Sequence, residues 1–295
     1  MTEPFAVHEE VRAALAAGRP VVAVETSVLS HGLPRPENEE AARRMAAAVR
    51  ERGGEPAWVW VGGGSVRLGA TDEDLARLCD PTHVAKVARR DLPMAVAGGG
   101  LGGTTVSATV WATRRAGISV AATGGIGGVH RGTGDVSADL AELARTPVAL
   151  VCSGPKSILD PVATAERLEE LGVGLLGYRT GRLPFFVARE APVPLEHRAD
   201  DPAAVAAVLR ARAALEVGSA LLVCNPVPAE AALDPTEVGA AVERCLERAA
   251  GATGKEVTPF LLRCLAEETG GRTLRANLAL LEANAALAAD VAALL

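Results

Sequence analysis

The chain has 295 residues, of which 49% are hydrophobic and 22% are charged. This composition supplies enough apolar material for a buried core and argues against an intrinsically disordered chain. The formal net charge is −6, and no Lys/Arg run interleaved with aromatic residues occurs, so a small molecule is a better expected partner than a nucleic-acid polymer. The length fits one large domain, and we expect residues 1–295 to form it.

The start of the chain and its cysteines indicate a reducing compartment. Residues 1–20 contain glutamates where a secretory signal would have a basic start and an apolar run, and no stretch of about 18 uninterrupted apolar residues follows. We therefore expect a cytoplasmic protein without a membrane-spanning segment. The five cysteines are widely spaced without a CxxC pair, which favours buried thiols over a disulfide framework or a structural zinc site. They are Cys79, Cys152, Cys224, Cys245 and Cys264.

Short apolar runs alternate with helical patterns along most of the chain. Residues 21–29 form a valine-rich run typical of a buried strand, and residues 38–51 have the apolar and charged faces of an amphipathic helix. Further strands are expected at 57–64, 92–99, 118–125, 148–154, 172–180 and 220–226, an amphipathic helix at 198–216, and mostly helices after Pro228. This alternation predicts an α/β architecture with a largely parallel central sheet, whose functional loops lie at the carboxyl ends of the strands.

The basic residues are strongly biased, with 27 arginines and only three lysines, Lys86, Lys156 and Lys255. A desolvated lysine can lose its proton and act as an amine nucleophile, whereas arginine keeps its charge. The lysines therefore either have chemical roles or remain by chance, and composition leaves both interpretations open. Lys156 follows an expected strand and a Gly-Pro turn, where α/β enzymes place functional groups.

Glu25 interrupts an otherwise apolar strand near its carboxyl end. A carboxylate is costly to bury there unless it has partners, and the same location suits a general acid. Glu25 and Lys156 can meet across the carboxyl edge of the predicted sheet, although spacing alone does not establish contact.

Residues 123–143 contain the densest glycine cluster of the chain. Glycines allow the backbone to approach a ligand closely, and Ser137 is placed to cap a helix that begins near Ala138. These features predict a phosphate site, but a tight turn from strand to helix explains them equally.

Two aspartates and a histidine lie within the same cluster. Asp135 and Asp139 offer hard oxygen ligands for manganese or magnesium, while an aspartate in the first turn of a helix is also favourable without a metal. His130 is either a hydrogen-bonded structural group or a substrate contact, and the surrounding glycines favour the contact.

Nine motifs run in order across nearly the whole chain: VETSVLSHGLPRPEN (24–38), KVARRDLP (86–93), GGTTVSAT (102–109), ATGGIGGVHRG (122–132), DVSADLAEL (135–143), CSGPKSILD (152–160), GYRTGRLPFF (177–186), CNPVP (224–228) and GKEVTPFLL (254–262). Together they resemble the pseudouridine-5′-phosphate glycosidases, which are related to indigoidine synthase A. The resemblance implies an α/β/α fold and a homotrimer. It also implies reversible cleavage of the carbon–carbon bond of pseudouridine 5′-phosphate to uracil and ribose 5-phosphate, with a divalent metal, typically Mn²⁺.

The resemblance also implies roles for residues within these motifs. Lys156 corresponds to the nucleophile, Glu25 to the acid and Asp135 to the metal-binding aspartate. The positions that correspond to substrate contacts are Lys86, Val106, Ser137, Ala138 and Asp139. Lys255, the third lysine, receives no role, and the few aromatic candidates for stacking on the base are Tyr178, Phe185 and Phe186.

The implied reaction explains why a lysine is needed. Ordinary glycosidases protonate a leaving oxygen with a carboxylic acid, and a C-glycoside has no such oxygen. The resemblance implies that Glu25 protonates the ribose ring oxygen while the neutral amine of Lys156 attacks C1′. Protonation of the uracil carbon then permits elimination, and water releases the sugar from its imine. Lys86 either directs positive charge toward the substrate or keeps the Lys156 amine neutral.

Two alternatives remain open. Only Thr133 and Gly134 separate the HRG motif from Asp135, which is shorter than is usual in the family and favours a C-glycoside synthase that joins ribose 5-phosphate to another aromatic acceptor. The other alternative is a non-catalytic sugar-phosphate binding protein. The joint presence of Glu25, Lys86, Lys156 and Asp135 argues against it, because a binder needs no imine-forming lysine.

Overall fold

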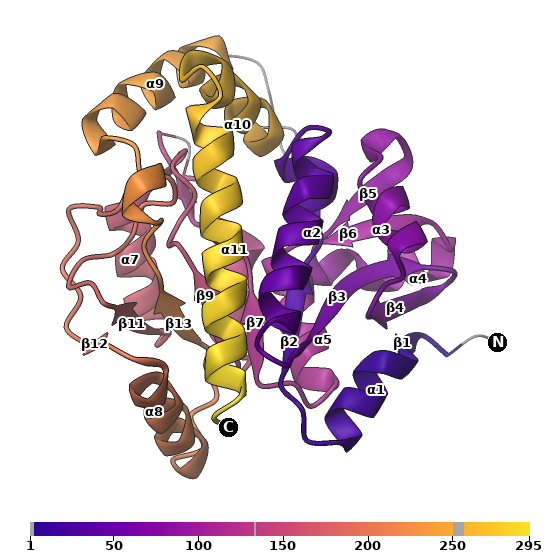
Figure 1. Cartoon of the computed structure of the whole chain (residues 1–295). Coiled ribbons are helices and arrows are strands. Elements are labelled where there is room, and N and C mark those ends of the chain that lie inside the picture. The colour runs from indigo at the N-terminus through magenta and orange to yellow at the C-terminus, as the bar shows by residue number, and fades with distance from the viewer. Residues whose placement is uncertain (1–2, 133, 250–256) are drawn as a thin grey trace.

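An 11-stranded mixed sheet runs through the computed structural model, which describes residues 3–132, 134–249 and 257–295 (Figure 1). Its strands are β1 (Phe5–Val7), β2 (Val21–Glu25), β3 (Glu55–Gly62), β4 (Ser65–Leu68), β5 (Val84–Val87), β6 (Leu101–Thr104), β7 (Val120–Ala122), β9 (Ala149–Cys152), β11 (Gly174–Tyr178), β12 (Arg198–Ala199) and β13 (Leu221–Cys224). The main path is β1-β4-β3-β2-β7-β9-β13-β11-β12, while β6 pairs with β3 and β5 pairs with β6. Two short strands, β8 (Val129–His130) and β10 (Leu159–Asp160), form a separate antiparallel pair.

The centre of the sheet, from β3 through β2, β7, β9 and β13 to β11, is parallel throughout. Every residue of β2 and of β9 is buried, as expected for strands covered on both faces. The antiparallel pairs β3–β4 and β3–β6 extend the sheet on the side of the N-terminus. The prediction of an α/β fold with a largely parallel sheet is confirmed.

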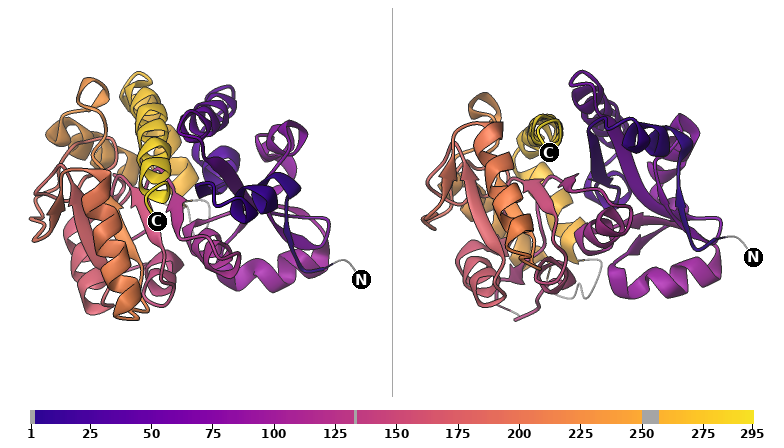
Figure 2. Two further views of the ribbon diagram at one scale, coloured as in Figure 1. Left: turned by 60° about the horizontal axis from the view of Figure 1, so that its bottom comes forward. Right: turned by 90° about the horizontal axis from the view of Figure 1, so that it is seen from below.

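Helices cover both faces of this sheet. They are α1 (Glu9–Ala16), α2 (Glu37–Arg50), α3 (Asp72–Leu78), α4 (Leu92–Gly98), α5 (Val106–Arg115), α6 (Ala138–Leu143), α7 (Pro161–Glu170), α8 (Pro202–Ala214), α9 (Pro235–Arg248), α10 (Val257–Glu268) and α11 (Arg272–Ala292). Short helical turns are η1 (Val28–Gly32), η2 (Pro81–His83), η3 (Arg89–Asp91) and η4 (Ala229–Ala231). Figure 2 shows α11 nearly end-on beside the strands.

The alternation of side chains along β2 separates the two apolar cores. Val22 and Val24 pack in one core with α2 and α11, whereas Val21 and Ala23 pack in the other with α1, α5, α6 and α7. Because successive side chains of a strand point to opposite faces, one apolar run supplies both cores. The result is the three-layered α/β/α arrangement that the resemblance implies.

One expected strand is wrong. Residues 92–99 are not a strand, because Leu92–Gly98 form helix α4. Pro93 lies in the first turn of this helix, where its missing N–H costs nothing, and Gly99 ends it in a left-handed conformation. Within the helix Leu92 is buried but Met94 is 62% exposed, so this apolar run lacks the two-sided burial of a central strand.

The expectation of five buried thiols is only partly correct. Cys245 of α9 and Cys264 of α10 form a disulfide, which contradicts the expected absence of disulfides. Their sequence separation is 19, and the two helices pack side by side, so tertiary packing brings together cysteines whose spacing gives no such signal. Cys79, Cys152 and Cys224 are free and buried, and burial raises the pKa of the Cys79 thiol to about 11.

Candidate functional site

The candidate residues Glu25 and Lys156 meet at the carboxyl edge of the parallel strands. Glu25 is the last residue of β2, Thr123 directly follows β7, and Lys156 lies in the loop after β9. These three residues line one inner cavity, together with Lys86. Glu25 and Lys156 therefore line the same cavity at this edge of the sheet.

Two hydroxyl groups hold the Glu25 carboxyl group, whose residue is only 2% exposed. Ser27 donates a hydrogen bond to one carboxylate oxygen, and Thr123 donates to the other. The strand ends at Glu25, and η1 begins at Val28, so the chain turns sharply and brings Ser27 back to the carboxylate. Uncharged donors on both oxygens therefore fix the direction of the carboxyl group.

Backbone contacts anchor the loop that carries Lys156. The Lys156 N–H donates to Ile126 O at 3.1 Å, and the Ile126 N–H donates to Gly154 O at 3.0 Å. Gly154 has φ +77°, and a side chain there would overlap the carbonyl oxygen of Pro184. After Lys156 the chain enters β10, which pairs with β8 of the glycine-rich loop. The loop that carries Lys156 is therefore bonded to the glycine-rich loop on both sides of the lysine, through Ile126 and through this strand pair.

A second cavity lies outside the inner one and shares Ser27, Lys86 and Lys156 with it. Lys86 reaches this position from β5, where it pairs with Gly103 of β6. The predicted residues that line the outer cavity are His130, Asp135, Ser137, Ala138 and Asp139. The structure therefore brings eight of the nine candidate site residues to two adjoining cavities, since Glu25 lines the inner one.

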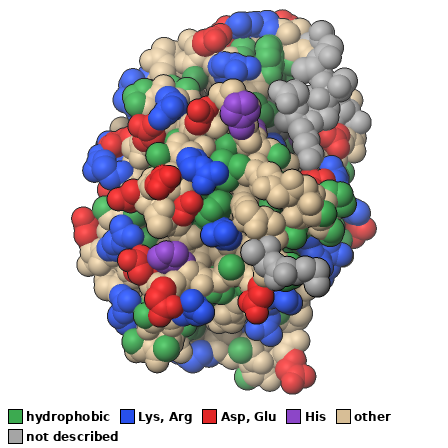
Figure 3. Space-filling view, turned by 90° about the vertical axis from the view of Figure 1, so that its right-hand side faces the viewer, with side chains coloured by type: hydrophobic (Ala, Val, Ile, Leu, Met, Phe, Trp, Pro, Cys, Tyr) green, Lys and Arg blue, Asp and Glu red, His purple; other side chains and the backbone are tan. Residues whose placement is uncertain are grey.

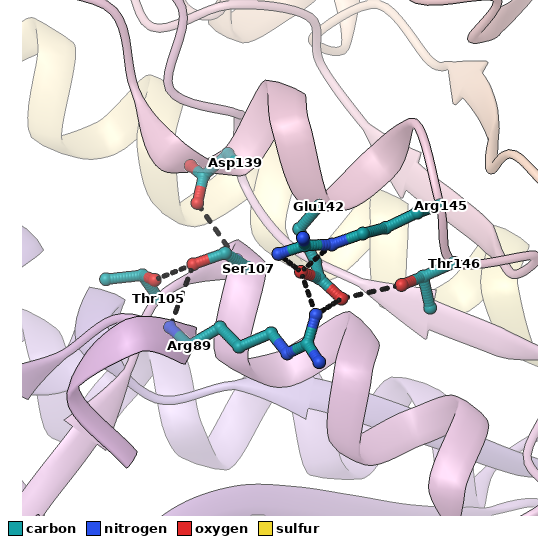
Figure 4. Close-up of polar contacts among 7 residues, drawn as sticks. All are labelled: Arg89, Thr105, Ser107, Asp139, Glu142, Arg145 and Thr146. Carbon is teal, nitrogen blue, oxygen red and sulfur yellow. Dashed lines mark hydrogen bonds and ion pairs between the residues drawn. The ribbon is translucent and has the colours of Figure 1, made fainter. Parts of the chain in front are cut away.

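The glycine-rich loop folds against the first turn of α6, as the pattern predicts. The Ser137 hydroxyl caps this helix by accepting the Asp139 N–H at 3.2 Å. Gly127 packs so closely on Ser137 that a side chain there would overlap the hydroxyl. Backbone groups occupy both oxygens of the Asp139 carboxylate. It accepts the N–H of Ser107 at 2.9 Å (Figure 4) and the N–H of Gly127 at 3.0 Å. Asp139 therefore orients the loop, and its side chain lines the cavity from a fixed position.

A buried carboxylate next to this loop ties it to the segment that follows Lys86. Glu142 of α6 is 1% exposed and accepts from both Arg89 and Arg145, at 2.8 Å and 2.6 Å (Figure 4). Thr146 donates to the same carboxylate at 2.7 Å. Arg89 begins η3, just after β5, so this cluster fixes the strand of Lys86 relative to α6.

His130 and Asp135 lie at the two ends of one tight turn, where the His130 N–H donates to Asp135 O at 2.8 Å. Burial lowers the pKa of the His130 ring, the nearby Asp135 carboxylate opposes this shift, and Lys86 and Lys156 add to it. The imidazole is therefore neutral at pH 7 and can donate and accept hydrogen bonds.

The donor set around Asp135 suits only a largely hydrated metal ion. Within the described ranges, no group of three or more His, Cys, Asp or Glu side chains is arranged to hold a metal. Asp139 lines the same cavity, but backbone N–H groups already occupy its oxygens. A divalent ion here would have Asp135 as its carboxylate ligand, with water and substrate completing the shell.

Some predicted residues lie elsewhere. Val106 is the first residue of α5, and its side chain is buried in the apolar core, so only its backbone can reach a ligand beside Thr105. Of the aromatic candidates, Phe186 lines the inner cavity, whereas Tyr178 and Phe185 pack in the cores. Lys255 lies outside the described residues, as does Thr133 of the shortened connection.

Sequence reasoning missed Asn277, which reaches the inner cavity from α11. Asn277 is 6% exposed, and its Oδ1 is a buried side-chain oxygen without a hydrogen-bond partner within the described part of the chain. An unpaired acceptor is costly to bury, so this atom needs a donor from a ligand or water. Nothing in the alanine-rich C-terminal pattern distinguishes Asn277 from a solvent-exposed amide. Arg90, another residue that we did not predict, lines the outer cavity.

A third cavity adjoins the inner one on the side of α10. The two share His31, Gly32 and Leu262. The apolar side chains of this third cavity include Leu33, Leu262 and Leu274. The inner cavity is thus flanked by a polar space on one side and a more apolar space on the other.

The surface offers no single-sign patch on the face drawn in Figure 3, where basic and acidic side chains are interspersed. This is consistent with the acidic net charge and with a small-molecule partner. Among the helices that the structure describes, none combines the length and the apolar character needed to cross a membrane.

Comparison with known proteins identifies the family. The model of the family described as indigoidine synthase A like protein matches residues 10–294. Pseudouridine-5′-phosphate glycosidase of Methylobacterium nodulans is 52% identical over 96% of this chain and 86% of its own length. The protein of the same name from Geobacillus kaustophilus is 44% identical over 99% of both chains.

Two solved structures share the fold over 99% of this chain and 97% of their own. An indigoidine synthase A-like protein of Thermotoga maritima is 41% identical, with a TM-score of 0.90. The prealnumycin C-glycosynthase AlnA, solved in complex with ribulose 5-phosphate, is 38% identical, also with a TM-score of 0.90. The chain thus belongs to the indigoidine synthase A-like family, whose members include the pseudouridine-5′-phosphate glycosidases.

Proposed function

We propose that this protein is a pseudouridine-5′-phosphate glycosidase, which reversibly cleaves the carbon–carbon bond between uracil and ribose 5-phosphate. The observation that carries this proposal is the shared cavity of Glu25, Lys86 and Lys156 in a chain with relatives of that name. An amine nucleophile beside a hydroxyl-oriented carboxyl group suits a glycosidic bond that has no leaving oxygen.

Glu25 and Lys156 open the sugar ring in the first step. The Glu25 carboxylic acid gives its proton to the ribose ring oxygen, while the neutral Nζ of Lys156 attacks C1′. The C1′–N bond forms and the bond from C1′ to the ring oxygen breaks. The open-chain sugar is then bonded both to Lys156 and to C5 of uracil. The hydroxyls of Ser27 and Thr123 hold the carboxyl group in one direction for this transfer.

The second step releases the base. The newly bonded Lys156 nitrogen first gives a proton to the Glu25 carboxylate, which frees the nitrogen lone pair. Glu25 then passes a proton to C5 of uracil, the bond between C1′ and C5 breaks, and the lone pair of Lys156 forms the protonated imine, whose hydrolysis later returns a proton to Glu25. Water then adds to the imine, which restores the free amine and releases ribose 5-phosphate. The overall reaction consumes one water and returns Glu25 to its protonated state.

The two cavities suggest how the substrate is oriented. Lys86 and Arg90 bring positive charge to the outer cavity, which also contains the start of α6 at Ser137 and Ala138, so the phosphate lies on this side. The unpaired Oδ1 of Asn277 is an acceptor for an N–H group of the base in the inner cavity. Phe186 supplies an apolar surface there.

A divalent metal, typically Mn²⁺, would be held by Asp135 with water and substrate oxygens. When bound, it would supply positive charge beside the phosphorylated sugar. The neutral ring of His130 at the other end of the same turn can hydrogen-bond a sugar hydroxyl.

The first test is mass spectrometry of the reaction products. The purified protein is incubated with pseudouridine 5′-phosphate and Mn²⁺, with an EDTA control and the Lys156→Ala variant. The proposal requires metal-dependent release of uracil and ribose 5-phosphate that is lost in the variant. A folded wild-type protein that releases neither product contradicts it.

Light scattering of the same sample tests the homotrimer, and fractionation of cells tests the proposed cytoplasmic location.

A C-glycoside synthase is the second candidate. The third cavity offers additional, partly apolar space next to the inner one, where an aromatic acceptor larger than uracil can extend. A C-glycosynthase is also among the proteins with the same fold. Rates of C-glycoside formation from ribose 5-phosphate with uracil and with larger aromatic rings separate the two, because a glycosidase prefers uracil.

A further inference from the structure

One side chain joins the loops that carry the acid and the nucleophile. Asn284 of α11 is completely buried and lies between the carboxyl ends of β7, β9 and β13. Its Nδ2 donates to Thr123 O at 2.9 Å and to the Ser153 hydroxyl at 3.1 Å. Its Oδ1 accepts from Nδ2 of Asn225 at 3.0 Å. Every polar atom of the amide thus has a partner, and each partner comes from a different strand end.

The partners of Asn284 lead directly to the reacting groups. Thr123, whose carbonyl accepts from Asn284, donates its hydroxyl to the Glu25 carboxylate. Ser153 begins the Ser-Gly-Pro-Lys turn that ends at Lys156, and its N–H donates to Gly124 O at 2.9 Å. A displacement of the Asn284 amide would therefore act on Glu25 through Thr123 and on Lys156 through Ser153.

We propose that Asn284 is a positioning residue that sets the Glu25 carboxyl group and the Lys156 amine in their reactive arrangement. This inference rests on the proposed function, but it concerns a residue that touches neither the substrate nor the cavity. Asn284 is not among the residues that line the inner cavity, whereas Asn277 on the same helix is.

The planar amide is suited to this position because it carries donors and an acceptor on opposite sides. Leucine has a similar volume but leaves the Thr123 carbonyl and the Asn225 amide without these partners. Aspartate keeps the acceptor for Asn225 but presents an oxygen to the Thr123 carbonyl. Asn284→Asp is therefore the sharpest substitution, because it replaces the donor to Thr123 and Ser153 by an acceptor at nearly constant volume.

The experiment measures kcat and KM for pseudouridine 5′-phosphate in wild type, Asn284→Asp and a control. Since small misplacements of reacting groups reduce rates by up to about 100-fold, we expect kcat of Asn284→Asp to fall roughly 10- to 100-fold with KM nearly unchanged. Thr273→Val is the matched control. It removes a buried hydroxyl of α11 that lies 3.1 Å from the Thr269 hydroxyl and outside the site, so it lowers Tm and leaves kcat unchanged.

Two further measurements keep the inference testable. If Asn284→Asp does not fold, Asn225→Ala removes the donor to Oδ1, and kcat should still fall several-fold. Hydrogen exchange of segments 123–127 and 153–158 should be at least tenfold faster in Asn284→Asp than in Thr273→Val. This readout does not depend on the reaction, so it decides the inference even if the wild-type protein is inactive, a result that would refute the proposed function alone. If Asn284→Asp has the kcat of an active wild type, or the same exchange as Thr273→Val in both segments, the positioning role of Asn284 is overturned.

Discussion

The parallel centre of the sheet and its mixed N-terminal side contribute differently to the site. Glu25 ends the parallel strand β2, and Lys156 follows the parallel strand β9. The loop after β7 connects them, because Thr123 donates to Glu25 and Ile126 forms backbone hydrogen bonds with the Lys156 loop. Lys86 comes from β5, which joins the sheet only through β6. The centre places the groups that make and break bonds, and the mixed side adds a positive charge to the same cavities. We therefore expect the two lysines to respond differently to substitution.

The largest effect should follow the loss of the Lys156 amine. Lys156→Arg keeps the charge but cannot form an imine, so kcat should fall by roughly 10⁴-fold or more. Lys86→Arg is the matched control on the other side of the sheet, and it should retain a substantial part of the activity because only charge is required there. Steady-state uracil release measures both. Equal losses in the two variants would contradict the division of roles.

The next effect concerns the acid at the end of β2. Glu25→Gln keeps the shape of the side chain and one oxygen that accepts from Ser27 or Thr123, places an amide donor at the other hydroxyl, and removes the transferable proton. General acid catalysis typically contributes 10²- to 10⁴-fold, so we expect kcat to fall by about that factor with little change in stability. Rates from quenched-flow samples and a thermal melt of the same preparation measure the two quantities. A variant with normal kcat would exclude Glu25 as the acid.

The link between the two sides can be broken at Glu142. Glu142→Ala leaves Arg89 and Arg145 without their shared buried carboxylate, and loss of one partner of a buried ion pair typically costs 3–5 kcal/mol. Because both arginines are partly exposed, we expect the free energy of unfolding to fall by about 3 kcal/mol at most. Urea denaturation measures this change, and KM should rise more than kcat falls. A stability within about 0.5 kcal/mol of wild type would contradict the bracing role.

The smallest expected effect is a change in the pKa of His130. Burial lowers the pKa of His130 below its ordinary value of 6.5, while Asp135 opposes the shift. The contribution of His130 to the free energy of unfolding is therefore complete above pH 6.5, where the ring is neutral in both states. It decreases as the pH falls from 6.5 through the lower pKa of the folded state. Asp135→Asn removes the opposing charge and should lower the pKa further. NMR titration of the ring protons in both proteins checks the sign. A higher pKa of His130 in Asp135→Asn would refute the claim that the Asp135 carboxylate raises this pKa.

Much of the parallel centre could be predicted from the sequence, because its strands are continuous apolar runs that end in glycine or polar turns. The same pattern failed at residues 92–99, where an apolar run forms α4 on the periphery. Periodicity cannot distinguish a short buried strand from a short helix, and the leading Pro93 was the available signal for a helix. The disulfide between Cys245 and Cys264 was missed because only the packing of α9 on α10 brings these residues together.

The site residues also differ in whether the sequence alone could predict them. Glu25 and Lys156 have signals in the sequence, because a charge at the end of an apolar strand is unusual and lysine is rare in this chain. The resemblance supplied Lys86 and Asp135. Asn277 and Asn284 have no such signal, since their roles depend on which face of α11 meets the strand ends. The role of a single asparagine in an alanine-rich helix can be recognised only from its tertiary contacts.

The most direct test of the central claim is to trap the covalent intermediate. The protein is incubated with ribose 5-phosphate, reduced with sodium borohydride and digested, and the modified peptide is located by mass spectrometry. The account predicts one reduced pentose phosphate on the peptide that contains Lys156, with no modification of Lys86 and none in Lys156→Arg. Stable attachment at Lys86, or no adduct on a folded and active enzyme, would contradict the claim that Lys156 forms the imine.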